Sequence, residues 1–215
     1  MKRSPKEWGL RIIALMIGLT IAHLGVTLFL LAELGSDPFN VLIQGTFRSL
    51  SSATGWAFLT HGRVHIAACF LIILILLIVD RSYIKIGTVL CMICGGPIID
   101  FFTMILAPLQ IRLLPMPARI AVLVLGCVIL AYGMTIVIKS DAGTGPNDLV
   151  AIVISDKIHR RFSIIRIIVD ICFVAAGWLL GGTFGIGTII CAFLVGPVAG
   201  IFLPVNERII NRLVQ

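Results

Sequence analysis

The stretch that decides the fold is Ile12–Ala32, IIALMIGLTIAHLGVTLFLLA, which has 21 residues and no Asp, Glu, Lys or Arg. A helix of this length rises about 30 Å, which is the thickness of the hydrocarbon core of a bilayer. A secretory signal has a shorter apolar region of about 7–15 residues, followed by a small-residue cleavage motif. The stretch therefore predicts a retained first membrane helix, with the basic residues before it in the cytoplasm.

The whole chain has the same apolar character. Of its 215 residues, 59% are hydrophobic and 13% are charged, whereas soluble domains carry about 25% charged residues. This composition excludes soluble enzymes, nucleic-acid-binding modules and disordered chains. We predict an all-α, polytopic helical membrane protein in which residues 1–215 form a single domain in the lipid bilayer. The further apolar segments are 64–79, 86–107, 119–138, 163–180 and 186–203.

The chain also repeats itself. Residues 11–41 align without a gap with residues 119–149, and the aligned pairs include Gly18 with Gly126 and Gly25 with Gly133. Further along, Gly87-Thr88 matches Gly187-Thr188 and Gly96-Pro97 matches Gly196-Pro197. Ordered blocks of this kind predict an internal two-fold repeat. The first copy covers about 11–107 and the second about 119–204, each with three long helices and one short helix after a Gly/Pro loop.

The two short helices, Pro38–Leu50 and Pro146–Ile158, leave the direction of the repeats open. Each rises about 20 Å, which is less than the hydrocarbon thickness. If they return the chain part-way, each copy crosses the membrane three times and the copies are inverted. If they complete a crossing, each copy crosses four times and the copies are parallel.

Charge favours the parallel arrangement. Arg11 and Arg119 are equivalent in the two copies and both are basic, as are Arg63 and Arg166. Copies that face the same way share their inside-positive pattern. We therefore expect Lys139–Gly145 and Gly181–Gly185 to lie on the same, outer side of the membrane.

The Gly/Pro loops are the predicted solute site. Asp37 and Gly145 are the expected N-caps, and each is followed by proline, so two helices begin with free N–H groups and a positive dipole end. Such ends bind anionic or polar groups where repeats meet in a membrane, although the loops could instead be capped surface turns without a ligand. Because Asp37 and Asp148 would repel an anion, a zwitterion, a cation or a proton-coupled solute stays open. The predicted substrate-binding residues are Asp37, Pro38, Asn40, Gly143, Gly145, Pro146, Asn147 and Asp148.

Three charged residues within apolar segments are predicted to act in coupling or gating. Arg166 and Asp170 lie four residues apart on one helical face, and an unpaired charge in the membrane is costly, so we expect them to pair. The pair could equally be a structural lock between helices. Asp100 has Gly200 as its counterpart, so the repeat itself does not require this carboxylate.

Three common motifs of catalytic and nucleotide-binding sites are absent. The chain has no P-loop, no H-E-x-x-H and no G-x-S-x-G, the patterns of nucleotide, zinc-protease and hydrolase sites. Cys91 and Cys94 form one C-x-x-C without a further ligand nearby, and apolar packing explains them. We expect no metal, no cofactor, no catalytic residue and no enzymatic activity. A third alternative, a lipid-modifying enzyme, would need a catalytic pair near the level of the headgroups, and none is visible in the sequence.

The ordered motifs resemble one family. They are Gly35–Leu42, Gly87-Thr88, Gly95–Asp100, Gly143–Asp148, Arg166-x-x-x-Asp170, Gly177–Gly182, Gly185-x-Gly187-Thr188 and Gly196-Pro197. Together they are similar to the YczE family of bacterial integral membrane proteins. The resemblance implies the architecture and a multi-pass location in the bacterial inner membrane, but no substrate. One departure is Asp80–Lys85, which replaces the family's first Gly-rich connector, so no close-packed functional turn is expected there.

The function predicted from these features is a transporter or channel for a small polar or anionic solute, bound between the two copies. Because the chain has no ATP-binding part, the driving force would come from a gradient or from another subunit. The alternative is a non-transporting accessory or scaffold protein for a partner complex or biosynthetic system, which predicts a filled interior. The N-terminus is expected in the cytoplasm, nucleic acid is not an expected partner, and the protein is expected to be a monomer or a homodimer.

Overall fold

The computed structural model describes residues 4–35, 37–56, 59 and 61–214, and within them every regular element is helical. This confirms the all-α prediction. The α-helices are α1 (Pro5–Leu31), α2 (Pro38–Thr54), α3 (His61–Asp80), α4 (Ile86–Leu106), α5 (Met116–Ser140), α6 (Pro146–Lys157), α7 (Phe162–Leu179) and α8 (Ile186–Val214). Short 3-10 turns follow α3 (η1, Arg81–Tyr83) and α4 (η2, Ala107–Leu109; η3, Ile111–Leu113).

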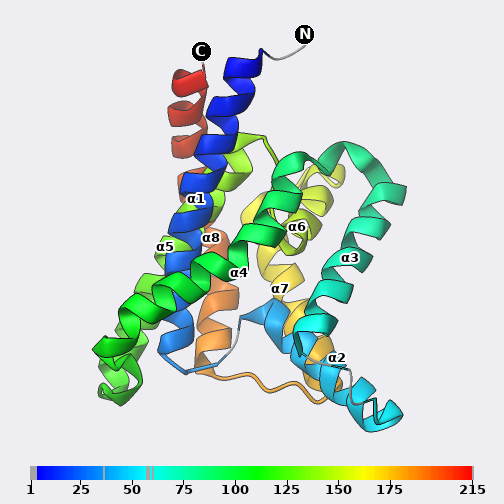
Figure 1. Ribbon diagram of the computed structural model, residues 1–215, viewed down its shortest axis with the longest axis vertical. Coiled ribbons are helices and arrows are strands. Elements are labelled where there is room, and N and C mark those ends of the chain that lie inside the picture. Colours follow the sequence, from blue (N-terminus) through cyan, green and yellow to red (C-terminus); the bar gives the residue numbers. More distant parts are fainter. Residues whose placement is uncertain (1–3, 36, 57–58, 60, 215) are drawn as a thin grey trace.

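Six of the described helices are long and apolar enough to cross a membrane: α1, α3, α4, α5, α7 and α8. The other two are shorter. α2 has 17 residues and lies at the lower end of the molecule in Figure 1, whereas α6 has 12 residues and lies in its upper half. Both termini lie at the upper end (Figure 1), as six crossings require.

Helices α1 and α5 pack in antiparallel directions through glycines. Gly18 lies against Gly133, and Gly25 lies against Gly126. A Cβ atom on Gly25 would lie 2.3 Å from the backbone nitrogen of Leu130. The two backbones are therefore in direct contact, as in other membrane helix pairs that use small residues.

Two arginines bond the ends of this helix pair. Arg11 Nη1 donates to the carbonyl of Ser140 at 3.0 Å, and Arg119 Nε donates to the carbonyl of Ala32 at 2.9 Å. Each arginine thus satisfies an otherwise free carbonyl at the carboxyl end of the opposite helix.

The antiparallel packing shows that the expected parallel arrangement is wrong. The segment Lys139–Gly145 lies at the end of the molecule that carries both termini, and Gly181–Gly185 lies at the opposite end (Figure 1). Arg11 and Arg119 each bond a carbonyl at the carboxyl end of the other helix, which accounts for a basic residue at both positions. These bonds do not require the two arginines to lie on the same side of the membrane.

The loop after α5 docks on the start of α4, and the loop after α1 docks on the start of α8 in the same way. The amide of Gly87, at the start of α4, donates to the carbonyl of Ala142 at 2.8 Å. The amide of Gly187, at the start of α8, donates to the carbonyl of Leu34 at 2.9 Å. Gly35 and Gly143 have φ values of 141° and 137°, a region that favours glycine.

The helices that follow are less evenly packed. α7 packs along both α8 and α2. Helices α3 and α4 lie apart in Figure 1 and do not pack along each other over their described residues. Instead, α3 contacts α2 and α6, and α4 contacts α1. The molecule is therefore closed on the side of α7 and α8 and more open on the side of α3 and α4.

The glycine contact between α1 and α5 can be tested with two matched substitutions. Gly25→Ala should lower the free energy of unfolding by about 1–3 kcal/mol, because the new methyl group overlaps backbone atoms. Gly9→Ala, in the same helix with no atom within 4 Å of its Cβ position, should leave stability unchanged or raise it by up to about 1 kcal/mol. Thermal unfolding in detergent measures both. Equal effects at the two positions would contradict the contact.

Candidate functional site

The loop before α6 brings the first group of predicted site residues against α4. A Cβ atom on Gly143 would lie 2.4 Å from the backbone nitrogen of Thr88, so the loop lies directly on the start of α4. Gly145 is the N-cap of α6, as predicted, and it gives the helix no side-chain cap. Pro146 follows at the first helical position and is buried. The first turn of α6 therefore depends on other groups to satisfy its N–H donors.

The loop before α2 is capped differently. Asp37 is the N-cap, as predicted, and its carboxylate accepts a hydrogen bond from the amide of Asn40 at 3.2 Å. The side-chain amide of Asn40 also donates to this carboxylate. Pro38 is buried at the first helical position. The carboxylate of Asp37 and the two amide groups of Asn40 thus satisfy each other's hydrogen bonds at the start of α2.

A three-residue ion cluster lies between α6 and α7. Arg166 Nε donates to Asp170 Oδ2 at 2.9 Å, which confirms the predicted pairing. Arg166 Nη1 also donates to Asp148 Oδ1, in the first turn of α6, and lies 3.9 Å from the sulfur of Met134 on α5. Arg166 and Asp170 are both buried, with exposed fractions of 8% and 1%. One guanidinium therefore serves two carboxylates in the interior.

The starts of both short helices lie near this cluster. Asp170 is within electrostatic reach of Asp148 at the start of α6 and of Asp37 at the start of α2. His23 on α1 and Cys91 on α4 are within reach of Asp148. The structure therefore brings residues of both predicted loops around the Arg166–Asp170 pair.

The remaining predicted residues have different positions. Asn147 lies beside Asp148, and its side-chain amide donates to that carboxylate at 3.2 Å. Asp100 is exposed on α4, and none of the interactions that join Asp148, Arg166 and Asp170 includes it. Asp100 is thus the one predicted coupling residue that the structure separates from the cluster.

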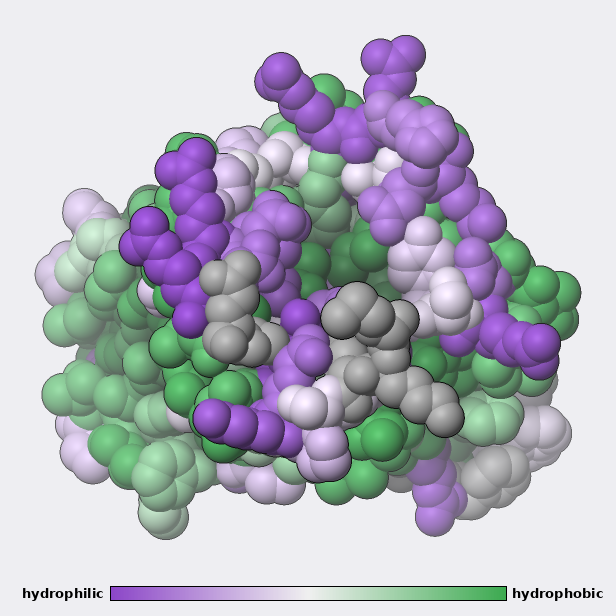
Figure 2. Space-filling view, turned by 90° about the horizontal axis from the view of Figure 1, so that it is seen from above, coloured by the Kyte–Doolittle hydropathy of each residue, from purple (hydrophilic) through white to green (hydrophobic). Residues whose placement is uncertain are grey.

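A cavity of about 690 Å³ opens at the end of the molecule that carries both termini. It lies between α6, η1 and the ends of α1, α5 and α8. Figure 2 looks onto this end, where hydrophilic side chains surround a hollow with more apolar atoms deeper inside. Its lining residues are Arg11, Ser82, Tyr83, Lys85, Ile138, Lys139, Asp141, Gly143, Thr144, Leu149, Ile152, Asp156, Glu207 and Asn211.

The charges in the cavity wall are of both signs and are largely paired. Lys139 Nζ lies 2.9 Å from Glu207 Oε2, and Lys85 forms an ion pair with Asp141. Tyr83 donates to Asp156 at 3.0 Å across the cavity from η1 to α6. Such a wall presents donors and acceptors together, which suits a polar or zwitterionic solute better than a strongly charged one.

Thr144 is the lining residue with an unused polar group. Its side chain is 4% exposed, and its hydroxyl has no hydrogen-bond partner among the described residues. A buried hydroxyl without a partner is costly, so such groups are rare outside binding sites. Thr144 lies two residues before Pro146 and thus joins the cavity to the start of α6.

Sequence analysis did not single out Thr144 or the cavity wall. Thr144 stands within the quoted Gly-Thr-Gly-Pro motif, but its burial and its lack of a partner are properties of the folded chain. The Asp80–Lys85 connector was expected to carry no functional turn, yet Ser82, Tyr83 and Lys85 form one wall of the cavity. Long-range pairing of Lys85 with Asp141 has no signal in the local sequence.

At the opposite end, direct contacts close the space between α2, α7 and the connection to α8. A Cβ atom on Gly45 would lie 2.2 Å from the carbonyl oxygen of Gly177, so the backbones of α2 and α7 touch. Arg48 and Ser49 of α2 donate to the carbonyls of Gly181 and Leu180, at 2.8 and 2.9 Å. The amide and hydroxyl of Thr183 donate to Gln44 at 2.7 and 2.8 Å.

The ion cluster predicts an order of stabilities. Arg166→Ala should be the most damaging substitution, by about 3–5 kcal/mol, because it leaves the buried carboxylate of Asp170 and the half-buried one of Asp148 without their shared cation. Asp170→Ala should cost less, because Arg166 keeps Asp148 as a partner. The double variant Arg166→Ala/Asp170→Ala should be more stable than Arg166→Ala alone.

Thermal unfolding in detergent measures this order. Arg112→Ala is the matched control, since Arg112 is exposed, and it should change stability by less than about 0.5 kcal/mol. Strictly additive losses in the double variant would mean that Arg166 and Asp170 are not coupled.

Comparison with known proteins places the chain in a family. Residues 9–204 match the model of the Family of unknown function (DUF6198). The chain is 30% identical over 198 residues to the uncharacterized membrane protein YczE of Bacillus subtilis (strain 168), covering 92% of this chain and 87% of YczE.

Two further relatives are an uncharacterized protein of Haemophilus influenzae (strain ATCC 51907 / DSM 11121 / KW20 / Rd) and YyaS of B. subtilis. They are 27% and 25% identical and cover 91% and 89% of this chain, and 84% and 92% of their own lengths. No solved structure matches the chain significantly. The match over most of its length, together with the identity to YczE, shows that this chain is a membrane protein of the DUF6198 family.

Proposed function

We propose that this protein is a secondary transporter built from two inverted copies of one unit, about 11–107 and 119–204. The matched contacts support the repeat. Arg11 bonds the end of α5 as Arg119 bonds the end of α1, and the start of α4 docks on the loop after α5 as the start of α8 docks on the loop after α1. Equivalent contacts in an antiparallel pair are those of a two-fold axis in the membrane plane, as in many transporters.

The observation that carries the transport proposal is the difference between the two ends. One end opens into a cavity of about 690 Å³ that reaches the Gly143–Pro146 loop. At the other end, α2, α7 and the connection to α8 are joined by backbone contact and by hydrogen bonds from Arg48 and Ser49. A cavity that is open on one side of a central site is one state of an alternating-access cycle. An accessory protein with a filled interior fits this structure less well.

The exchange between states follows from the repeat. α7 packs along α8, whereas their counterparts α3 and α4 lie apart. In the proposed cycle, α3 and α4 approach each other as α7 separates from α8. The α1–α5 pair, held by its glycines, stays fixed. The solute, a small polar or zwitterionic molecule, binds between the starts of α2 and α6.

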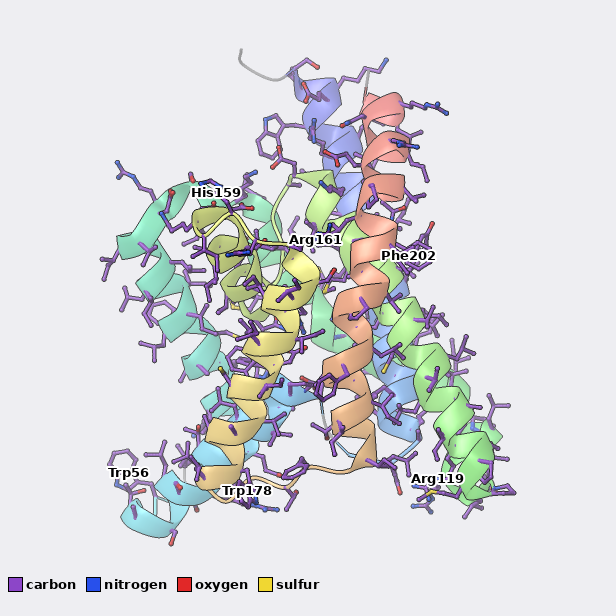
Figure 3. The ribbon with its side chains drawn as sticks, turned by 180° about the vertical axis from the view of Figure 1, so that it is seen from behind. Trp56, Arg119, His159, Arg161, Trp178 and Phe202 are labelled. Carbon is purple, nitrogen blue, oxygen red and sulfur yellow. The ribbon has the colours of Figure 1, made fainter. Side chains whose placement is uncertain are left out.

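Charge supports an orientation with both termini in the cytoplasm of a bacterial inner membrane. Figure 3 shows His159 and Arg161 at the end that carries the termini, and Arg119, Trp56 and Trp178 at the opposite end. Among the described residues, ten Lys and Arg side chains lie at the first end, against four at the other. The ten are Lys6, Arg11, Arg81, Lys85, Lys139, Lys157, Arg160, Arg161, Arg208 and Arg212; the four are Arg48, Arg63, Arg112 and Arg119. The inside-positive rule then makes the open end cytoplasmic.

Access to the two ends tests the proposal. In a variant without the six native cysteines, Ile152→Cys lies in the cavity wall, and its counterpart in the other copy is Gln44→Cys at the closed end. A membrane-impermeant thiol reagent applied from the cytoplasmic side should modify position 152 rapidly. The same reagent applied from the outside should leave position 44 unmodified.

A transported solute should reverse this pattern, protecting position 152 and exposing position 44 to the outside. Both positions modified from the same side would contradict the inverted arrangement. Position 152 unmodified from the cytoplasm would contradict the open state.

Thr144 gives a separate test of the solute site. Thr144→Val should leave stability unchanged or raise it, because the hydroxyl that it removes has no partner. The same change should weaken the thermal stabilisation that a bound solute provides, by about 0.5–1.5 kcal/mol, because a hydrogen bond to the solute is lost.

Thr135→Val is the matched control. The Thr135 hydroxyl donates to the carbonyl of Tyr132 at 2.7 Å and accepts from Asn206 at 2.6 Å, so its loss should cost about 1–3 kcal/mol of stability. The measurement is the shift in unfolding temperature of purified protein across a library of small anions, zwitterions and cations. A stabilising solute whose effect survives Thr144→Val places the site elsewhere.

A further inference from the structure

The carboxylate of Asp170 has one oxygen bonded and one oxygen unused. Oδ2 accepts from Arg166 Nε at 2.9 Å. Oδ1 has no hydrogen-bond partner among the described residues, and the residue is only 1% exposed. A buried acceptor that nothing satisfies is rare in folded proteins and points to a group that binds there.

The charges around this oxygen do not balance. Arg166 supplies one positive charge, whereas Asp148 and Asp170 supply two negative charges. Asp37 adds a third negative charge within electrostatic reach. The starts of α2 and α6 offset about half a charge each. Asp148 and Asp37 are partly exposed, whereas Asp170 is buried, so the excess negative charge is most expensive at Asp170.

Among the described residues, no positive side chain other than Arg166 reaches Asp170 from α7 or from the elements that pack on it. The titratable groups that face Asp170 are Asp148 from α6, Asp37 from the start of α2, Cys191 from α8 and Arg166 from α7 itself. His23 of α1 faces Asp148, and its Nδ1 lies 2.8 Å from the carbonyl of Leu19 in its own helix. The positive charge that would balance these carboxylates must then come from a bound ion.

We propose that Asp170 binds a proton on Oδ1, and that this proton is the coupling ion of the transport cycle proposed above. A proton needs one lone pair, which the unused oxygen offers, whereas a metal cation needs several oxygen ligands. The carboxylate takes the proton from hydronium and releases water. Arg166 and Asp148 are then left as a neutral pair. Release to water on the other side restores the carboxylate and the excess negative charge.

Two ion pairs connect Asp170 to α6, the helix that lines the cavity. Leu149 and Thr144 line the cavity, and Asp148, next to Leu149, bonds Arg166 directly. Arg166 in turn bonds Asp170. Proton binding at Asp170 is therefore coupled to the strength of the Arg166–Asp148 pair and, through it, to the position of α6.

Infrared spectroscopy of the purified protein tests this without a known solute. A protonated carboxylic acid has a C=O stretching band that a carboxylate lacks, and the band shifts in D2O. We expect a buried-acid band that grows as pH falls and that shifts in protein labelled with carbon-13 at the aspartate side-chain carboxyl. Asp170→Asn should remove it. Asp100→Asn, at the exposed carboxylate of α4, should retain it.

The isotope label needs no substitution, so the test stands even if Asp170→Asn fails to fold. The absence of an aspartic acid band at any pH at which the protein is folded overturns the proposal. So does a band that is lost in Asp148→Asn but kept in Asp170→Asn, or a band that sodium chloride abolishes and choline chloride does not. Proton binding without any solute movement would leave the proton site standing and overturn transport alone.

Discussion

The backbone contact between α1 and α5 is the constraint on which the rest of the structure depends. Gly18, Gly25, Gly126 and Gly133 let the two helices touch along their length, and any side chain at Gly25 or Gly133 would overlap backbone atoms. The contact is possible only in one direction and one register. Arg11 and Arg119 form hydrogen bonds at the two ends of this helix pair, so they fix its register at both ends.

That contact also decides where the site lies. The loops after α1 and α5 leave the pair at opposite ends, and each turns back through a glycine with positive φ. α2 and α6 then begin near the centre and run outward to opposite ends. Two helix starts that follow loops at opposite ends of the α1–α5 pair thus lie around Arg166 and Asp170. The central position of these starts follows from the antiparallel packing together with the turns at Gly35 and Gly143.

In the proposed transport cycle, the difference between the open and the closed end depends on residues that differ between the two proposed copies. Gly45 and Gly177 bring α2 against α7. In the proposed repeat, their counterparts on α6 and α3 are the larger residues Val153 and Leu74. The half with the larger side chains borders the cavity. The half with the glycines is closed. A separate difference concerns the N-caps, since Asp37 caps α2 with its side chain and Gly145 leaves α6 without a side-chain cap.

The sequence by itself determined the class of protein and the helices. Long apolar runs such as Ile12–Ala32 form helices in a bilayer because no water is available to satisfy a free backbone, and prolines at positions 38 and 146 mark where the short helices begin. The spacing of Arg166 and Asp170 was enough to predict their pairing, because residues four apart share one helical face.

Only the tertiary structure decided the relative direction of the matching helices and the balance of charge around Arg166. Matching arginines in two segments are equally consistent with a shared membrane side and with bonds between helix ends, and hydropathy is the same for a helix read in either direction. Asp148 joins Arg166 from another helix, so the excess negative charge could not be counted from local sequence. The unused oxygen of Asp170 and the free hydroxyl of Thr144 exist only once every neighbour has been placed.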